Sequence, residues 1–426
     1  MSRTTLSMHH IARVEGHGNV HVVIEDGTVR DVRMNIVEPA RLFESMVAGR
    51  PFDKVSYIAS RICGICSSSH VVTDLMAIED AFGVEVSDRT RMLRELLVYG
   101  SYLQNHASHL FVFAAPDFLG EESLFPVAEK DPELFQGGLA VKALGNELCT
   151  KIGGRSIHPI TAVPGGFTHE ITSAEYLELA DKLAAMRPFV EHVVDVFAAF
   201  PVPDIASTGD FLALHEDGHY AVASGSPRFV KDGVEFAVRD YRDYIEEYTV
   251  EHSAAYFSRR ADTGETFAAS ALARINTSWN ELTREARLAA AKAGLRPPAL
   301  NPYHNNVAQA VELVDACVRC ETMLRTLAEM QGTSEPVAVV PRAGRGVGMT
   351  EAPRGTLVHD LEFDAQGRVA RANIITPTVH NLSDTEKNVR QVAEKLAAQG
   401  VDEAALRLEI EKLVRAYDPC LSCSVH

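Results

Sequence analysis

Short stretches in which apolar and polar residues alternate lie near both ends of the chain. Residues 18–37 predict two antiparallel strands joined by an Asp-Gly turn at 26–27. A second hairpin is predicted for residues 357–375, around a turn at 364–367. The sequence therefore predicts a small amount of β structure at each end of the chain.

Between and after these hairpins, apolar residues recur every three or four positions. This spacing predicts amphipathic helices. The predicted helices cover residues 87–115, 173–199, 266–293, 306–331, 384–398 and 403–416. No Gly/Ser-rich linker separates them. We expect a mainly α fold with small α+β parts: a single helical-bundle domain over residues 1–426, whose N- and C-terminal β hairpins bring the two ends of the chain together.

The composition narrows the possible functions. With 46% hydrophobic residues, 23% charged residues and a net charge of −17, the chain has the composition of a globular protein. So acidic a chain is unsuited to nucleic acid or anionic lipid, which both require a basic face. The most apolar run, residues 111–119, contains Pro116 and Asp117, and no stretch approaches the roughly 20 apolar residues of a membrane span. The N-terminus lacks the apolar run of a signal peptide, so we expect a cytoplasmic protein.

Four of the seven cysteines form two CxxC pairs at opposite ends of the chain. Cys63 and Cys66 lie in Arg-Ile-Cys-Gly-Ile-Cys, and Cys420 and Cys423 lie in Asp-Pro-Cys-Leu-Ser-Cys. A two-residue spacer lets both thiolates of a pair face one metal, and four thiolates suit zinc, an Fe–S cluster or another thiophilic ion. Structural zinc is the simplest interpretation, but paired zinc knuckles usually lie about 15–20 residues apart, whereas these pairs span most of the chain.

Two further motifs accompany the cysteine pairs. Arg-Val-Glu-Gly-His occupies residues 13–17, and Glu-Ala-Pro-Arg-Gly occupies residues 351–355. Together with His70 after the first pair and a final His after the second, they resemble the signatures of the nickel–iron hydrogenase large subunit. The resemblance extends in order from residue 13 to residue 426, which is more specific than any one motif. It implies the fold of that subunit and an enzyme that reversibly splits H2 into protons and electrons.

The resemblance implies a ligand role for each of the four cysteines. Cys63 and Cys420 correspond to terminal ligands of nickel. Cys66 and Cys423 correspond to ligands that bridge nickel to an iron carrying carbonyl and cyanide groups. Soft thiolates are suitable ligands for a redox-active nickel.

Residues around the cysteines also acquire roles from the resemblance. Glu15 corresponds to a glutamate that carries protons away from Cys420. Arg354 corresponds to a guanidinium placed over the open coordination position, with Asp418 as its partner and Pro353 in the pocket wall. Arginine suits that place because it keeps its charge and presents a rigid fork of donors. A strand-edge carboxylate and a surface salt bridge are the ordinary alternatives for Glu15 and Arg354.

The resemblance also implies a third metal, usually magnesium. Glu44 and His426 correspond to its side-chain ligands, and the backbone carbonyl of Leu382 is our candidate for a third ligand. A single carboxylate with several waters is typical of magnesium. His70 corresponds to a donor to a cysteine sulfur, a contact that tunes a metal site. A hydrogen-bonded core histidine is the alternative.

Several other polar residues receive structural interpretations. Asn105 stands where many family members carry an Asp near the arginine, which leaves its role open. His106 and His109 share one helical face, and we interpret both as packing or hydrogen-bonding residues. The remaining cysteines are expected to be buried small residues: Cys149, Cys317 and Cys320.

The cysteine count implies partner subunits. The four ligands leave three of the seven cysteines, too few for a Cys₄ cluster, so the electrons must leave through an Fe–S small subunit. Residues 13–18 and 153–159 resemble the cytosolic, bidirectional branch of the family. We therefore expect a diaphorase-type subunit with flavin, or another acceptor. NAD(P), a deazaflavin, ferredoxin and a heterodisulfide reductase all stay open as acceptors.

Two rival functions share this fold. A quinone-module subunit of a respiratory complex lacks the four cysteines, so their presence argues against it. A hydrogen sensor keeps the same site but turns over slowly and signals through a partner.

Overall fold

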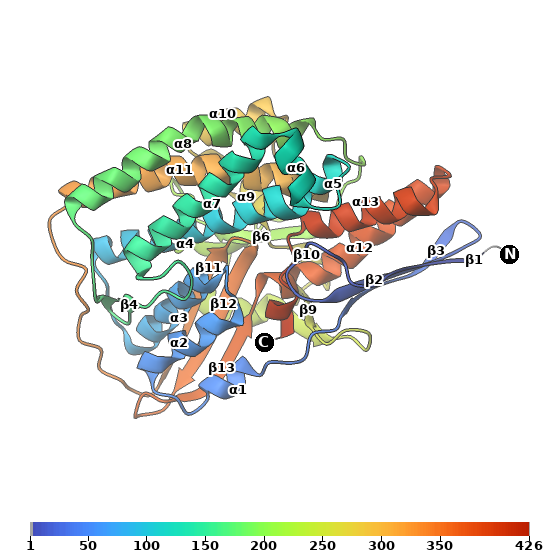
Figure 1. Ribbon diagram of the computed structural model, residues 1–426. Helices are drawn as coiled ribbons and strands as arrows, with labels where there is room; N and C mark the ends of the chain where they lie inside the picture. Colours follow the sequence, from blue (N-terminus) through green and yellow to red (C-terminus); the bar gives the residue numbers. More distant parts are fainter. Residues whose placement is uncertain (1–2, 426) are drawn as a thin grey trace.

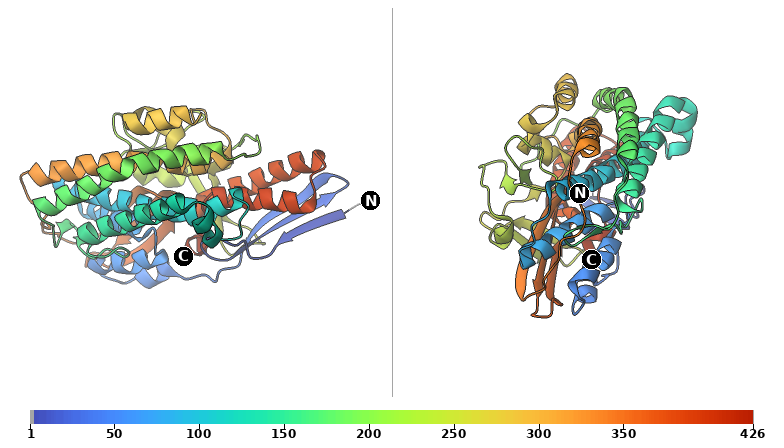
Figure 2. Two further views of the ribbon diagram at one scale, coloured as in Figure 1. Left: turned by 45° about the horizontal axis from the view of Figure 1, so that its top comes forward. Right: turned by 90° about the vertical axis from the view of Figure 1, so that its left-hand side faces the viewer.

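The computed structural model describes residues 3–425 as a layer of long helices packed over small sheets (Figure 1). Helices α4, α7, α8 and α11 pack against one another, and two further views show them side by side (Figure 2). The helices are α1 Phe43–Val47, α2 Val55–Ala59, α3 Ser67–Phe82, α4 Asp88–Ala107, α5 Ala115–Phe118, α6 Leu124–Lys130, α7 Pro132–Gly153, α8 Ser173–Ala199, α9 Ala271–Thr277, α10 Arg284–Lys292, α11 Asn305–Glu329, α12 Pro377–Ala398 and α13 Glu403–Ala416.

Within residues 3–425, the strands form three sheets of three strands and two short hairpins. The three larger sheets have the strand orders β1-β2-β3, β10-β6-β7 and β11-β12-β13. The strands are β1 Arg3–Met8, β2 Gly18–Glu25, β3 Thr28–Ile36, β4 Ala162–Val163, β5 Gly166–Phe167, β6 Asp210–His215, β7 Ser226–Phe229, β8 Ile245–Thr249, β9 Tyr256–Arg260, β10 Phe267–Ala268, β11 Gly344–Ala352, β12 Gly355–Phe363 and β13 Val369–Ile375.

The mainly α class and both terminal hairpins are confirmed. Helix α8 begins at its capping box: Thr172 accepts a hydrogen bond from the backbone of Glu175, whose side chain accepts one in return. The helix predicted over residues 266–293 is wrong in extent, because β10, α9 and α10 divide that stretch. The short strands β6 to β10 were not predicted, since a strand of two to six residues carries too little periodicity to be recognised.

The sheet β11-β12-β13 supports the first cysteine pair through α3. Gly346 and Gly348 of β11 lie directly against this helix: a Cβ atom at either would stand 2.0 Å from a backbone oxygen of α3, at Ala77 or Thr73. Only glycine allows this close approach. The contact holds the middle of α3, whose first residue follows Cys66, against the sheet.

The two ends of the chain meet as expected from the sequence. The Leu421 amide donates to the Glu15 carbonyl at 2.9 Å, and the Arg41 amide donates to the Val425 carbonyl at 2.9 Å. The main hydrophobic core includes residues from Leu6 to Val425. The C-terminal motif is therefore buried between N-terminal segments and α12.

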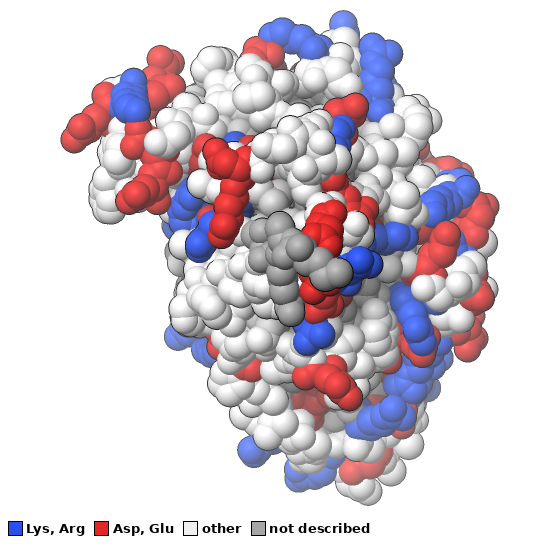
Figure 3. Space-filling model, turned by 90° about the vertical axis from the view of Figure 1, so that its right-hand side faces the viewer, with Lys and Arg blue, Asp and Glu red and all other residues white. Residues whose placement is uncertain are grey.

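The surface carries mixed charge. Figure 3 shows acidic and basic side chains interspersed with uncharged areas on the face it displays. Within residues 3–425, none of the helices combines the length and the apolar character needed to cross a membrane.

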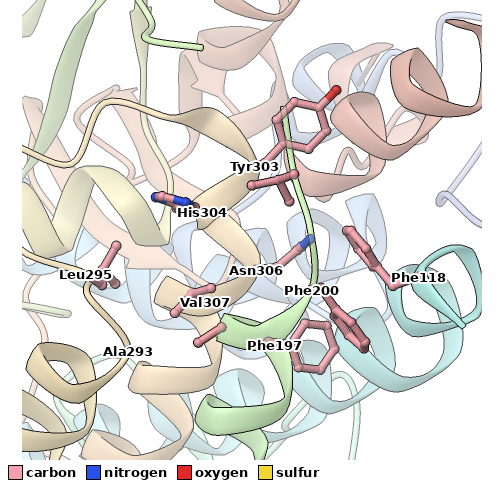
Figure 4. A pocket seen from close by; sticks show the side chains of 11 residues that line it. Phe118, Phe197, Phe200, Ala293, Leu295, Tyr303, His304, Asn306 and Val307 are labelled. Carbon is pink, nitrogen blue, oxygen red and sulfur yellow. The ribbon is translucent and has the colours of Figure 1, made fainter. Parts of the chain in front are cut away.

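A small cavity of about 40 Å³ lies between the end of α8 and the start of α11, lined largely by aromatic and aliphatic side chains (Figure 4). None of the described residues that line it carries a thiol or a carboxylate, so it does not compete with the cysteines as a metal site.

Candidate metal centre

The first cysteine pair occupies the loop that leads into α3. Cys63 has an extended backbone, and Cys66 is the residue that precedes the first turn of the helix. Their Sγ atoms lie 2.8 Å apart, and the Cys66 amide donates to the Cys63 sulfur at 3.2 Å. Both side chains are buried. The turn therefore points two sulfurs in one direction.

The second pair follows α13 and meets the first. The Cys420 amide donates to the Thr378 hydroxyl at 2.9 Å, which ties this loop to α12. The Cys420 sulfur lies 3.8 Å from that of Cys63, and all four Sγ atoms lie within 4.8 Å of one another. Cys420 and Cys423 lie within disulfide-bonding distance; a bound metal would require both as thiolates. The donor set fits a thiophilic metal centre.

The sulfurs differ in their surroundings. The hydrogen bond between the two thiols lowers the pKa of Cys63 and, together with burial, raises the pKa of Cys66. The charge of Arg354 also lowers the pKa of Cys63. The two sulfurs of the first pair therefore differ in how readily they lose a proton.

Arg354 lies at the tip of the turn between β11 and β12, with 2% of its surface exposed. Its Nη1 donates to the Cys66 sulfur at 3.4 Å, and its Nε donates to Asp418 at 3.1 Å. Its Nη2 has no hydrogen-bond partner among residues 3–425. Burial alone would lower the pKa of Arg354, but Asp418 raises it above the ordinary value. Arg354 therefore places a permanent positive charge beside the sulfurs, and its Nη2 group remains as an additional donor.

Asp418 receives hydrogen bonds from three side chains. Besides Arg354, Asn105 donates to it at 2.6 Å and Gln309 at 3.0 Å. Burial alone would raise the pKa of Asp418, but the charge of Arg354 holds it below the ordinary value. Asn105, whose role the sequence left open, is thus a donor to the partner of Arg354. Gln309 was not recognised from the sequence, because an amide within a helix carries no local signal.

His106 and His109 lie beside this group as hydrogen-bonding residues. The His106 ring contacts Glu312 at 2.8 Å, and the His109 ring contacts Gln309 at 2.5 Å and the Arg415 carbonyl at 2.6 Å. These contacts agree with the structural interpretation of both rings. Neither belongs to the cluster of four cysteines.

Glu15 touches the second cysteine pair directly. The Cys420 sulfur lies 3.0 Å from Glu15 Oε2. The Ser422 amide donates to the same oxygen at 3.2 Å, and the Ser422 hydroxyl donates to Oε1. Ser422 was missed in the sequence, although it lies inside the terminal CxxC motif. The carboxylate is therefore held by the same loop that carries the cysteine.

His70 lies one turn after Cys66 and is buried. Its Nδ1 contacts the His359 ring at 3.0 Å, and His359 contacts Asp74 at 2.6 Å. This chain of three polar side chains fixes the orientation of the His70 ring. The contact with a cysteine sulfur stays a prediction.

The structure places two of the three predicted third-metal ligands. The Ile374 amide of β13 donates to Glu44 Oε1 at 2.8 Å. Within a strand, the amide and the carbonyl of one residue point to the same side, so the Ile374 carbonyl faces Glu44 as well. Leu382 instead lies in the second turn of α12, where carbonyls serve the helix. Ile374 is therefore a backbone position beside Glu44 that the sequence did not suggest, and the ligand role of Leu382 stays a prediction. His426 lies outside the described residues.

The three remaining cysteines are buried away from the cluster, as expected. Cys317 and Cys320 lie inside α11, and Cys149 lies inside α7. Burial raises the pKa of Cys149 and of Cys317 to about 12. Such thiols are protonated and packed against apolar neighbours.

The fold and the cluster of four buried thiols define a metalloprotein, and comparisons with known proteins identify its family. The family model described as nickel-dependent hydrogenase matches residues 41–133 and 227–426. The chain is 35% identical to the sulfhydrogenase 1 subunit alpha of Pyrococcus furiosus over 99% of its length and 97% of that relative. It is 29% identical to the NAD-reducing hydrogenase HoxS subunit beta of Cupriavidus necator, over 98% and 93% of the two chains.

Solved structures agree with the sequence comparison. An NAD+-reducing [NiFe]-hydrogenase in the H2-reduced state matches with a TM-score of 0.89 and 29% identity, covering 100% of both chains. This chain belongs to the nickel-dependent hydrogenase family, as its large, catalytic subunit. The enzyme is an oxidoreductase acting on H2, and its nickel and iron fit the four-cysteine cluster.

Proposed function

We propose that Cys63 and Cys420 are the terminal nickel ligands, and that Cys66 and Cys423 bridge nickel to an iron that carries carbonyl and cyanide ligands. The convergence of all four sulfurs beneath Arg354 is the observation that carries this proposal. Among the sulfurs, that of Cys420 lies against a carboxylate, as a terminal thiolate that accepts protons requires. When bound, the nickel–iron group supplies the redox-active metals at which H2 is split into protons and electrons.

Glu15 moves the proton. Its Oε2 lies 3.0 Å from the Cys420 sulfur, which is within the reach of direct proton transfer. The Ser422 amide and hydroxyl hold both oxygens of this carboxylate in place. A proton held on the Cys420 sulfur therefore has a positioned acceptor that leads outward from the buried site.

Arg354 and Asp418 organise the space above the sulfurs. The pair is buried, so its charges act in a water-poor environment where they are stronger than at a surface. The spare Nη2 donor of Arg354 supports a role over the open coordination position. Pro353, which precedes it in the turn, would form the pocket wall, and His70 would donate to a cysteine sulfur.

We also propose a magnesium ion at Glu44 and His426, with the Ile374 carbonyl as the backbone ligand. The hydrogen bond that sets β13 beside Glu44 supports this arrangement. Hard oxygen ligands and water suit magnesium better than the neighbouring sulfurs would.

We propose that the whole chain forms one domain, since its hydrophobic core includes residues from both ends.

The electrons require partner subunits. The named relatives belong to multi-subunit hydrogenases, one of them NAD-reducing. We propose an Fe–S small subunit and, beyond it, a diaphorase-type subunit with flavin. NAD is a soluble intracellular nucleotide, which supports a cytoplasmic location. Other relatives are named F420-non-reducing hydrogenases. A heterodisulfide-linked or deazaflavin-reducing enzyme of the same family is the alternative.

The test is infrared spectroscopy with turnover on one preparation of the purified complex. We expect carbonyl and cyanide absorption bands, together with rapid H2-dependent reduction of NAD(P) or ferredoxin. Bands with very slow turnover would support the hydrogen sensor. Absence of the bands from an active complex would overturn the proposed iron ligands.

A further inference from the structure

A second buried arginine lies directly behind the turn that carries Arg354. Arg274 is in α9, with 1% of its surface exposed. Its Nη1 donates to the Ala352 carbonyl at 3.1 Å, and its Nη2 donates to the Pro353 carbonyl at 2.9 Å. These are the two carbonyls that immediately precede Arg354. No motif in the sequence singled out Arg274.

The rest of this guanidinium is held by two carboxylates. Its Nε and Nη2 donate to the two oxygens of Glu312 at 2.6 and 2.7 Å, and its Nη1 donates to Glu351 at 3.2 Å. All five N–H groups of Arg274 therefore have an acceptor. Glu312 is fixed in turn by the Tyr220 hydroxyl at 2.7 Å and by the ring of His106 at 2.8 Å. The clamp is rigid because every member is buried and hydrogen-bonded.

The turn itself leaves little freedom. Ala352 pairs with Gly355, so only Pro353 and Arg354 connect the two strands. Gly355 has a φ of +133°, and a Cβ atom there would stand 1.8 Å from the Ala269 carbonyl. The turn is thus pressed against the segment that leads into α9. The direction in which Arg354 leaves the backbone depends on how this turn is held.

We propose that Arg274 is a positioning residue for catalysis: by clamping the carbonyls of Ala352 and Pro353, it sets the guanidinium of Arg354 against the sulfurs and Asp418. This proposal rests on the role of Arg354 given above. A displacement of about 1 Å at a catalytic group can reduce a rate by roughly a hundredfold. Arg274 therefore acts through Arg354 and not on the substrate.

The substitution Arg274→Lys separates the effect of the positive charge from the effect of the hydrogen-bond geometry. Lysine keeps the cation beside Glu312 and Glu351, but its three N–H donors cannot serve two carboxylates and two carbonyls together. In the holoenzyme complex, we expect Arg274→Lys to reduce H2 oxidation about ten- to a hundredfold while the infrared bands of the metal centre persist. The loss should fall on the turnover number and leave the KM for H2 unchanged.

A double-mutant cycle with Arg354→Lys tests the mechanism. If Arg274 works by placing Arg354, adding Arg274→Lys to Arg354→Lys should change turnover by less than about twofold, because coupled residues are not additive. The same fold loss in both backgrounds would overturn the proposal. Wild-type turnover in Arg354→Lys alone would overturn the role of Arg354 itself, so the two failures are distinct.

Arg260 supplies the matched control. It is equally buried in β9, donates to Asp210 and Asp232, and stacks on an aromatic ring as Arg274 does. Arg260→Lys should lower thermal stability without changing turnover. If Arg260→Lys also slowed the enzyme, the loss of any buried arginine would reduce turnover, and this result would contradict the proposal. If Arg274→Lys does not assemble, Tyr102→Phe provides a second test in the same double-mutant cycle. The Tyr102 hydroxyl donates to the Glu351 carbonyl at 2.9 Å, next to the carbonyls that Arg274 holds. Tyr102→Phe should reduce turnover about threefold in the wild-type background and not in the Arg354→Lys background, and an equal loss in both backgrounds would overturn the proposal.

Discussion

Two CxxC motifs of this chain share a spacing but have different surroundings. Cys63 has an extended backbone and Cys66 directly precedes α3, and their sulfurs converge on those of the C-terminal pair. Cys317 and Cys320 lie within the regular turns of α11, with burial raising the pKa of both thiols. The comparison shows that a CxxC spacing forms a pair of metal ligands only where the cysteines lie outside regular helix and a second cysteine pair lies next to them.

The largest effect is expected at the terminal pair. Cys420→Ser and Cys423→Ser should each abolish H2 oxidation, because a hydroxyl is a poor ligand for a soft metal centre. Activity is measured on the purified complex, with circular dichroism to confirm folding. Retained activity in either folded variant would remove that residue from the ligand set.

Glu15→Gln should come next. Glutamine keeps the shape and the hydrogen-bonding reach of the side chain but cannot cycle a proton, so turnover and H2/D2O exchange should fall roughly a hundredfold or more. The metal centre should still assemble, as its infrared bands would show. Near-normal exchange would place the proton path elsewhere.

Arg354→Lys should slow the enzyme with the metals retained. Loss of the planar fork above the sulfurs is expected to cost ~3 kcal/mol of transition-state stabilisation, roughly a hundredfold in rate. An exposed ion pair would contribute well under ~1 kcal/mol. Intact infrared bands with wild-type turnover would refute the proposed placement over the open position.

The smallest effect on activity is expected in α11. Cys317→Ser combined with Cys320→Ser should leave most of the turnover, because neither thiol reaches the metal cluster. Each buried hydroxyl should instead lower the free energy of unfolding by about 1–3 kcal/mol unless it finds a partner. Thermal denaturation measures this loss. A double variant that folds but is inactive would mean that the helical pair also serves the metal centre.

The parts that could be predicted from the sequence are those with a local signal. Periodic apolar residues gave α8, α11 and α13, and the motifs gave the four cysteines, Glu15 and Arg354. Ile374 could not be found that way, because its place beside Glu44 depends on how β13 packs against α1. Ser422 and Arg274 were missed for a similar reason: a serine in a loop and an arginine in a short helix acquire a role only through tertiary contacts.

The most direct test of the central claim is the metal content of three preparations: the wild-type chain, Cys420→Ser, and the double variant Cys317→Ser with Cys320→Ser. We expect nickel and iron in equal amounts in the wild type and in the double variant, and loss of nickel in Cys420→Ser. Zinc in place of nickel and iron, or nickel retained in Cys420→Ser but lost from the double variant, would contradict the account.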